Sequence, residues 1–105
     1  MKKRTEAVDI IIPVYNGYDD LQLCMPSVLK HTDLTKHRLI LINDCSPDER
    51  IAPYLDDFAG EHILVLHNEK NLGFSANVNK GMAQSEDRDV LLLNSDTIVT
   101  AGWLD

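Results

Sequence analysis

Residues 89–97, with the sequence DVLLLNSDT, join an apolar run directly to a small polar cluster that ends in a carboxylate. Strands of an open α/β sheet are buried on both faces and therefore have continuous apolar sequences. Ligands of such sheets bind in the crevice outside the carboxyl ends of the strands. The segment thus predicts a buried strand with Asp96 at the mouth of a ligand site.

Three more segments share this short apolar character, and helix-like segments separate them. The predicted strands are Val8–Val14, Arg38–Asn43, His62–His67 and Asp89–Asn94. Alternation of strand and helix predicts right-handed crossovers and a doubly wound, mostly parallel α/β sheet. We expect the strand order 3-2-1-4, which places the switch point between the first and the fourth strand.

Each connection carries a helical pattern. The first has an apolar helical face made of Leu21, Cys24, Met25, Val28 and Leu29. Pro26 within it should kink the helix or shift its boundaries.

The second helix should begin at Ser46, with Pro47 at its first position and Glu49 completing a capping box, and Gly60 is placed to end it. In the third connection Phe74, Val78 and Met82 repeat every four residues behind Gly73, which predicts a short helix with its buried stripe on those side chains. The first N–H groups of that helix would favour an anion.

Length and charge limit the classes of function. The 105 residues, of which 44% are hydrophobic, supply one modest core, so we expect residues 1–105 to be a single domain. The formal net charge of −7 opposes the phosphate attraction on which nucleic-acid binders depend, which excludes nucleic acid as a main partner. A phosphorylated ligand would need local positive potential from a helix N-terminus, a cation or a metal.

Cys24 and Cys45 form no C-x-x-C or Cys/His ligand cluster, so we expect both to be reduced packing residues of a cytoplasmic protein. The apolar stretch that follows Met1–Arg4 is interrupted by Asp9 and Pro13 and is too short for a signal peptide, and no transmembrane span follows.

The four histidines have no metal-ligand spacing and no nucleophile nearby, and we expect surface or edge positions for His31, His37, His62 and His67. Lys70 is the one cation in a polar loop that could touch a phosphate, although a solvated lysine is the simpler interpretation.

The last six residues, Thr100–Asp105, look like the first turn of another helix, with Trp103 and Leu104 ready to pack on something absent. We therefore expect the segment to belong to a longer protein. An uncovered fourth strand would be an exposed sheet edge, and we expect a separate copy of these residues to self-associate.

Polar residues follow all four predicted strands directly: Tyr15 and Asn16, then Asp44, then Asn68 to Gly73, then Asn94 to Asp96. Each group by itself is typical of turns and helix caps. Their joint placement at the carboxyl edge favours a binding site.

In this order and spacing the sequence resembles the family 2 glycosyltransferases. The resemblance rests on IPVYNG at 12–17, INDCS at 42–46, NEKNLGF at 68–74 with Asn77 and Gly81, and LLNSDT at 92–97. It covers nearly the whole chain and implies the nucleotide-sugar-binding part of the A-type glycosyltransferase fold.

The resemblance also implies roles for individual residues. Pro13 and Tyr15 would lie against the nucleobase, Asn16 would belong to the same nucleotide-sugar site, and Asp44 would accept hydrogen bonds from the base or the ribose. The alternatives are an aromatic cover of the core for Tyr15 and a turn cap for Asp44.

In the third connection Asn71 and Gly73 would bring backbone close to the donor. Asn77 would add a side-chain amide; a solvated helix residue is its equal alternative.

The NSD sequence occupies the place of the family's Asp-x-Asp motif, in which the last carboxylate helps to hold a divalent cation on the donor diphosphate. Asp96 matches that position, and Asn94 departs from the pattern and is expected to bind ribose instead. Mg²⁺ or Mn²⁺ commonly takes one or two protein carboxylates plus phosphates and waters, so the substitution weakens the expected metal site without abolishing it.

The activity implied is transfer of a sugar, with inversion, from a nucleoside diphosphate sugar to a hydroxyl of an acceptor glycan or another compound. The resemblance places the general base beyond Asp105, so we expect these residues alone to bind donor weakly and to catalyse no transfer. The alternative is a non-catalytic α/β module that binds nucleotide or another protein.

Overall fold

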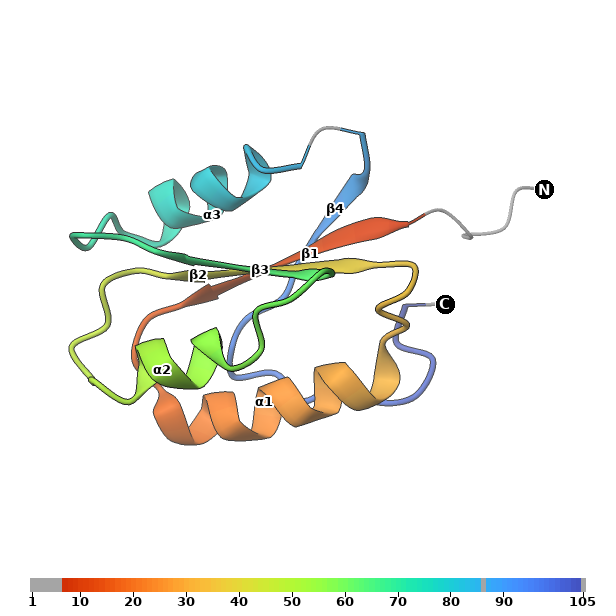
Figure 1. Ribbon diagram of the computed structural model, residues 1–105, viewed down its shortest axis with the longest axis horizontal. Coiled ribbons are helices and arrows are strands. Elements are labelled where there is room, and N and C mark those ends of the chain that lie inside the picture. The colour runs from red at the N-terminus through yellow and green to blue at the C-terminus, as the bar shows by residue number, and fades with distance from the viewer. Residues whose placement is uncertain (1–6, 86, 105) are drawn as a thin grey trace.

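The computed structural model describes residues 7–85 and 87–104. The elements follow in the order β1 (Val8–Val14), α1 (Tyr18–His31), β2 (Arg38–Asn43), α2 (Ile51–Asp56), β3 (Ile63–His67), α3 (Phe74–Met82) and β4 (Asp89–Leu92). In this part of the chain the four strands form one parallel sheet in the order β3-β2-β1-β4. Helices α1 and α2 cover one face and α3 covers the other (Figure 1). The predicted doubly wound sheet and its strand order are confirmed.

Residues of β1 and β2 fill both faces of the sheet, as continuous apolar strands require. Ile12 and Leu41 belong to a large buried cluster with the α1 side chains, whereas Ile11, Ile40 and Ile42 form a smaller cluster on the α3 face. All five side chains are fully buried. Burial of each such side chain contributes about 1.5–3 kcal/mol, so these central strands supply the rigid base of the fold.

Helix α1 runs without interruption through Pro26, which is exposed. The apolar face of the helix is buried as expected, with Leu21, Cys24, Met25 and Val28 turned toward the sheet.

Strand β4 ends at Leu92, two residues earlier than predicted. The N–H of Leu93 still donates to the carbonyl of Ile11, at 2.9 Å. The next bond of a parallel ladder would need an N–H from Pro13, which proline lacks. The chain therefore leaves the sheet here, and Asn94 to Asp96 form a turn at its edge.

The second helix begins at Ile51, so the prediction of a start at Ser46 is wrong. The Ser46 hydroxyl instead donates to Oδ1 of Asn43 at 2.7 Å and accepts the N–H of Asn16 at 2.9 Å. Residues 46–48 thus hold the neighbouring loop in place and are not available for a helical turn. Gly60 does not end the helix either, because it forms an isolated bridge with Ile63.

The buried stripe of α3 also differs from the prediction. Phe74 and Met82 are 59% and 46% exposed, and the buried residues of the helix are Asn77 and Gly81. Helix α3 approaches the sheet through Gly81, which has no side chain to hold the two apart. The four-residue apolar repeat therefore lies beside the contact face and not in it.

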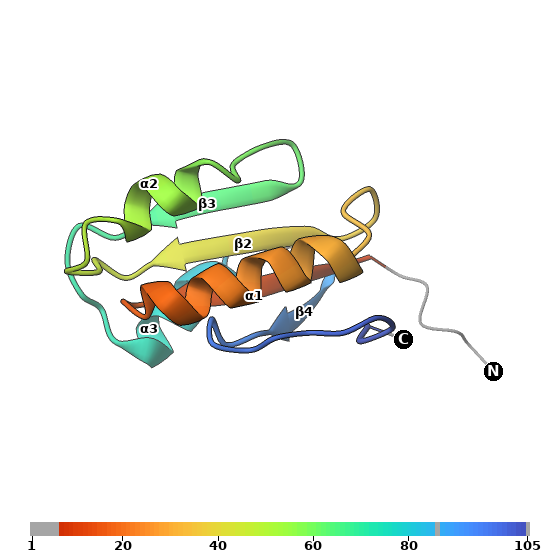
Figure 2. The same ribbon diagram turned by 90° about the horizontal axis from the view of Figure 1, so that it is seen from below.

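The segment from Leu93 to Leu104 runs along α1 (Figure 2). The N–H of Val99 donates to Oγ of Ser27, and Nε1 of Trp103 donates to Oγ1 of Thr32, both at 3.1 Å. Trp103 and Leu104 pack against the main core cluster. The expectation that these two side chains wait for an absent partner is therefore wrong.

Two further expectations are corrected by burial. His37 is buried, and its Nδ1 accepts the N–H of Val8 at 3.1 Å, whereas the other three histidines lie at element ends as expected. Cys24 is buried in the core, but Cys45 is exposed and has a left-handed backbone (φ 58°). Cys45 is therefore not a packing residue.

Within residues 7–85 and 87–104, no helix has the length and apolar character needed to cross a bilayer.

Candidate functional site

Four loops leave the sheet at the carboxyl edge of the strands. The pairing extends one step beyond the strands, because the N–H of Asp44 donates to the carbonyl of Val14 and the N–H of Asn68 donates to the carbonyl of Asn43, both at 2.8 Å. These bonds fix where the β2–α2 and β3–α3 loops begin. A cleft of about 570 Å³ lies between the loops.

Residues from all four loops line the cleft, and the β2–α2 loop contributes only its first residue, Asp44. All nine residues predicted from the four separate motifs line it, namely Pro13, Tyr15, Asn16, Asp44, Asn71, Gly73, Asn77, Asn94 and Asp96. Their roles toward a ligand stay predictions. Their spatial convergence follows from the parallel topology, which brings all carboxyl ends of the strands to one edge.

Asp44 is the best-held residue of the cleft. Its Oδ1 accepts bonds from Nδ2 of Asn68 and the N–H of Leu72, both at 2.8 Å. Its Oδ2 accepts bonds from the N–H of Gly73 at 2.9 Å and Nδ2 of Asn71 at 3.1 Å. The carboxylate, which is 3% exposed, thus fastens the β3–α3 loop to the end of β2.

The pKa of Asp44 reflects this environment. Burial acts to raise the pKa, but the hydrogen bonds from Leu72, Asn68 and Gly73, with the charge of Lys80, hold it below its ordinary value of 3.8. Asp44 is therefore ionised at neutral pH and needs its donors, since a buried charge without partners is costly.

Tyr15 and Asn16 directly follow β1. Tyr15 is 53% exposed and lines the cleft. The alternative role, in which its ring covers the core, is therefore wrong. Asn16 has φ 53°, and its Oδ1 accepts the N–H of Asp48 at 3.0 Å. The Asn16 side chain thus joins two loops, and Asn16 also lines the cleft.

Asn77 is neither solvated nor turned wholly to the cleft. It is 2% exposed, its Nδ2 donates to the carbonyl of Ile42 at 3.1 Å, and its Oδ1 accepts from Nδ2 of Asn68 at 2.7 Å. The amide therefore forms part of the floor, with both of its polar atoms bonded inside the protein.

The turn Asn94–Asp96 closes the side next to α1. Asn94 and Asp96 are exposed, and the carbonyl of Asn94 accepts the N–H of Thr97 at 3.1 Å. The Cys24 thiol of α1 lies beneath this turn, 3.9 Å from the same carbonyl. Burial raises the pKa of Cys24 to about 11, so this thiol is protonated and unreactive.

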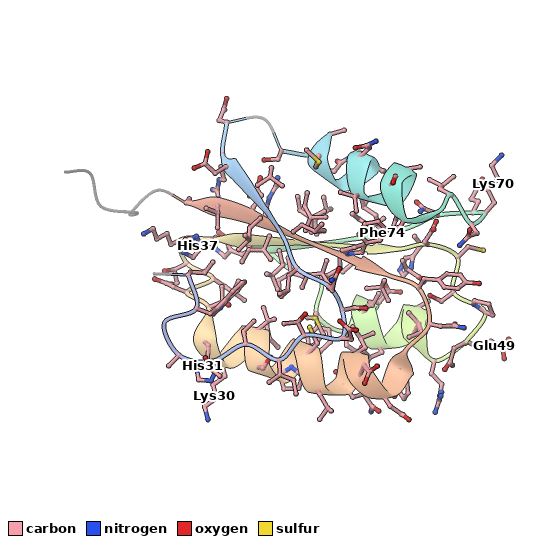
Figure 3. The ribbon with its side chains drawn as sticks, turned by 180° about the vertical axis from the view of Figure 1, so that it is seen from behind. Lys30, His31, His37, Glu49, Lys70 and Phe74 are labelled. Carbon is pink, nitrogen blue, oxygen red and sulfur yellow. The ribbon has the colours of Figure 1, made fainter. Side chains whose placement is uncertain are left out.

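Sequence reasoning missed five residues that also line the cleft: Val14, Gly17, Asp20, Phe74 and Ser95. Asp20 belongs to an acidic pair in the first turn of α1. Acidic residues are common there because they offset the helix dipole, so the sequence did not mark Asp20 as a site residue. Phe74 was assigned to the core by its spacing, and only its 59% exposure shows otherwise. Lys70 does not line the cleft and points outward from its loop (Figure 3).

The cleft is acidic. Among its lining residues, as far as the structure describes them, Asp20, Asp44 and Asp96 carry charge and none is a lysine, an arginine or a histidine. Within the described ranges, no three His, Cys, Asp or Glu side chains are grouped closely enough to hold a metal ion by themselves. One exposed carboxylate in an open cleft suits a cation that arrives with phosphate ligands, since Mg²⁺ is usually held by one or two carboxylates plus substrate phosphates.

TarS and GalNAc-T7 are among the solved structures that share this fold. TarS of S. aureus, residues 1–349 in complex with UDP-GlcNAc, aligns with TM-score 0.74 and 24% identity over 86% of this chain and 26% of that one. GalNAc-T7 with UDP, GalNAc and Mn²⁺ aligns with TM-score 0.77 and 21% identity over 97% of this chain and 20% of that one. The fold is that of the A-type glycosyltransferases, in its Rossmann-like N-terminal half.

Sequence comparison places the chain among glycosyltransferases. It is 31% identical over 99 residues to the uncharacterized glycosyltransferase YibD of Escherichia coli K12, covering 91% of this chain and 28% of YibD. It is 26% identical over 103 residues to the glycosyltransferase GlyG of Streptococcus pneumoniae, covering 96% of this chain and 34% of GlyG. The chain thus spans about a third or less of the length of these relatives. The family model for Glycosyl transferase family 2 matches residues 9–105, and the chain belongs to that family.

Proposed function

We propose that this chain binds a nucleoside diphosphate sugar in the cleft at the carboxyl edge of its sheet. The full-length protein would transfer the sugar, with inversion, to a hydroxyl of an acceptor glycan or another compound. The observation that carries the proposal is the convergence of nine residues, predicted from four separate motifs, on one cleft. TarS with UDP-GlcNAc and GalNAc-T7 with UDP and GalNAc, which share the fold, support this class of ligand.

The nucleoside would lie at the wall between β1 and β2. The exposed Tyr15 ring and Pro13 offer an apolar surface for a base, and Asn71 and the buried Asp44 stand at the floor beside it. Asp44 and Asn71 are bonded to each other, so a base or ribose that reaches either one meets a fixed polar surface. Such preorganised groups favour specific binding.

The diphosphate would lie toward Asn94 and Asp96, with Gly73 on the other side, because Gly73 has no side chain to hold a ligand away. The acidic lining repels a diphosphate unless a cation comes with it. Asp96 is the carboxylate we assign to Mg²⁺ or Mn²⁺, and the Mn²⁺ in the GalNAc-T7 structure supports a metal in this family of folds. When bound, the cation supplies positive charge that stabilises the departing diphosphate. Asn94 would bind the ribose.

In the proposed reaction a general base removes the proton of the acceptor hydroxyl, the oxygen attacks the anomeric carbon, and the nucleoside diphosphate leaves. This chain orients the donor. We assign the base to residues outside these 105, so the chain by itself binds donor and transfers no sugar. We further propose that the domain is cytoplasmic.

Isothermal titration calorimetry with UDP tests the proposal. We expect at least about tenfold tighter binding with Mn²⁺ than with EDTA, because the cation offsets the repulsion of the acidic cleft. Asp96→Asn should remove that gain. Asp57→Asn, at an exposed carboxylate after α2, is the matched control and should keep it.

The competing interpretation is a non-catalytic module, and the same titration separates the two. UDP binding of equal strength in Mn²⁺ and EDTA, or unchanged by Asp96→Asn, would favour a nucleotide-binding module without metal. No UDP binding under either condition would leave the cleft as a protein-interaction surface and would contradict the proposed function.

A further inference from the structure

A chain of polar side chains lies beneath the β3–α3 loop and connects α3 to Asp44. Lys80 donates from Nζ to Oδ1 of Asn68, and Asn68 donates from Nδ2 to both Asp44 and Asn77. Asn77 in turn donates from Nδ2 to the carbonyl of Ile42. Lys80 and Asn68 do not line the cleft, and the motif analysis gave neither of them a role.

The direction of every bond in this chain is fixed by its two ends. A lysine ammonium can only donate, so the Asn68 oxygen must face Lys80 and its NH₂ group must face the other way. An ionised carboxylate and a backbone carbonyl can only accept, so Asp44 and Ile42 require the NH₂ groups of Asn68 and Asn77. The two requirements agree, and the network has one consistent arrangement.

The arrangement of the network matters for the cleft because Asp44 is also bonded to the β3–α3 loop. The amides of Leu72 and Gly73, directly before α3, donate to the same carboxylate. Asn71 does so through its side chain. The position of Asp44 therefore sets the position of Asn71 and Gly73, which line the cleft.

We propose that Lys80 and Asn68 are positioning residues, which orient Asp44 and thereby hold residues 71–73 in the form that receives the donor. The role of Lys80 and Asn68 in donor binding rests on the proposed function, whereas their effect on the conformation of the loop does not. Lys80 also brings a positive charge near the buried carboxylate, which makes its ionised form less costly. A buried network of this kind stabilises one geometry when all of its members are bonded.

Lys80→Met tests the proposal, because methionine keeps most of the aliphatic stem and removes the donor and the charge. Hydrogen exchange by NMR reports directly on the two amides that Asp44 holds. We expect exchange at Leu72 and Gly73 to become at least about tenfold faster, with no change at Ile40 and Leu41 in the sheet centre, because the loop opens locally.

Lys80→Arg should restore slow exchange in large part, since it keeps a donor and a charge. Lys30→Met is the matched control: Lys30 is an exposed lysine in the last turn of α1, at the far end of the molecule from Lys70 and its loop (Figure 3). It should leave exchange at Leu72 and Gly73 unchanged. For UDP with Mn²⁺, we expect Lys80→Met to raise Kd about tenfold through the loosened loop.

Unchanged exchange at Leu72 and Gly73 in Lys80→Met would overturn the proposal. Faster exchange of all amides, including Ile40 and Leu41, would also overturn it, because Lys80 would then stabilise the whole fold and not the loop. If exchange at Leu72 and Gly73 becomes faster in Lys80→Met while the wild-type chain binds no UDP, the positioning role is supported and the proposed function is contradicted. The two failures are therefore distinguishable.

Discussion

Gly81 in α3 lies directly against Ile42 in β2: a methyl carbon added at Gly81 would stand 2.3 Å from Cδ1 of Ile42. It would also stand 2.8 Å from Cγ2 of Ile11. That second atom is bonded to Cβ of a fully buried side chain and cannot move aside freely. The close approach of α3 to the sheet, and with it the height of the cleft floor at Asn77, therefore depends on this glycine.

We expect Gly81→Ala to lower the free energy of unfolding by about 1–2 kcal/mol. Two contacts this short place the overpacking cost in the upper part of the usual range of about 1–3 kcal/mol, which exceeds the helix-propensity gain of at most about 1 kcal/mol. Urea denaturation measures the difference. Gly60→Ala is the control, because the nearest atom to an added carbon there is the Phe58 carbonyl oxygen at 3.9 Å. A Gly81→Ala protein as stable as wild type would show that α3 can move off the sheet without cost.

The Asp9–Arg38 pair should matter much more than an exposed pair. Asp9 is 1% exposed and accepts two bonds from Arg38, at 3.0 and 3.3 Å, with Arg88 at 3.6 Å. We expect Arg38→Met to cost about 2–3 kcal/mol, below the usual cost of breaking a buried pair because the arginine is partly solvated.

Arg50→Met is the matched control for that variant. It removes the exposed partner of Asp48 and should change stability little. Thermal and urea unfolding of both variants provide the comparison. Equal losses for Arg38→Met and Arg50→Met would mean that Arg88 alone satisfies Asp9.

His37 makes stability depend on pH. Burial, with the charge of Lys36, lowers its pKa from the ordinary 6.5, and its neutral Nδ1 accepts the Val8 N–H. A group with a depressed folded pKa binds protons more readily when unfolded, so its contribution is complete above pH 6.5 and is lost as pH falls toward the folded pKa. We expect the melting temperature to fall over this window.

His37→Asn should flatten the dependence, because the amide oxygen can accept the same N–H and does not titrate. His31→Asn, at a half-buried helix end, should leave it in place. Melting curves between pH 7.5 and about 5 make the measurement. An identical pH profile in the His37→Asn protein would contradict this assignment.

Strand β4 forms one edge of the sheet, and Val90 and Leu92 on it are 38% and 44% exposed. We expect a separate copy of these 105 residues to self-associate through this edge, because an apolar edge strand pairs readily. Leu92→Lys should reduce association in sedimentation velocity, and Leu23→Lys, at an exposed leucine of α1, should not. A monodisperse wild-type monomer at high concentration would show that the edge is protected.

The sequence by itself determined the sheet and the edge at which the site lies. Strands β1 and β2 have the predicted bounds, because an apolar run bounded by polar residues is a local signal. The strand order follows from alternation and crossover handedness, and the parallel topology then brings the residues that follow each strand to one cleft. The choice of the nine lining residues also used the resemblance to the family 2 glycosyltransferases, because Pro13 lies within β1 and Asn77 within α3.

Tertiary structure decided which partner each polar or apolar group takes. Ser46 has the sequence of a helix cap, yet it bonds to Asn16 across the neighbouring loop, so α2 starts at Ile51. Phe74 has the spacing of a core residue, yet Gly81 determines the face on which α3 packs.

Local patterns gave no signal of the partners of Lys80, Asn68 and Trp103. Their partners lie 9 to 71 residues away in the chain, so only the folded arrangement brings them together. Local sequence patterns predict helices and strands, because the spacing of apolar residues along a segment matches the period of the element that buries them. Hydrogen-bond partners across loops depend on distances that arise only when the sheet and its helices have packed.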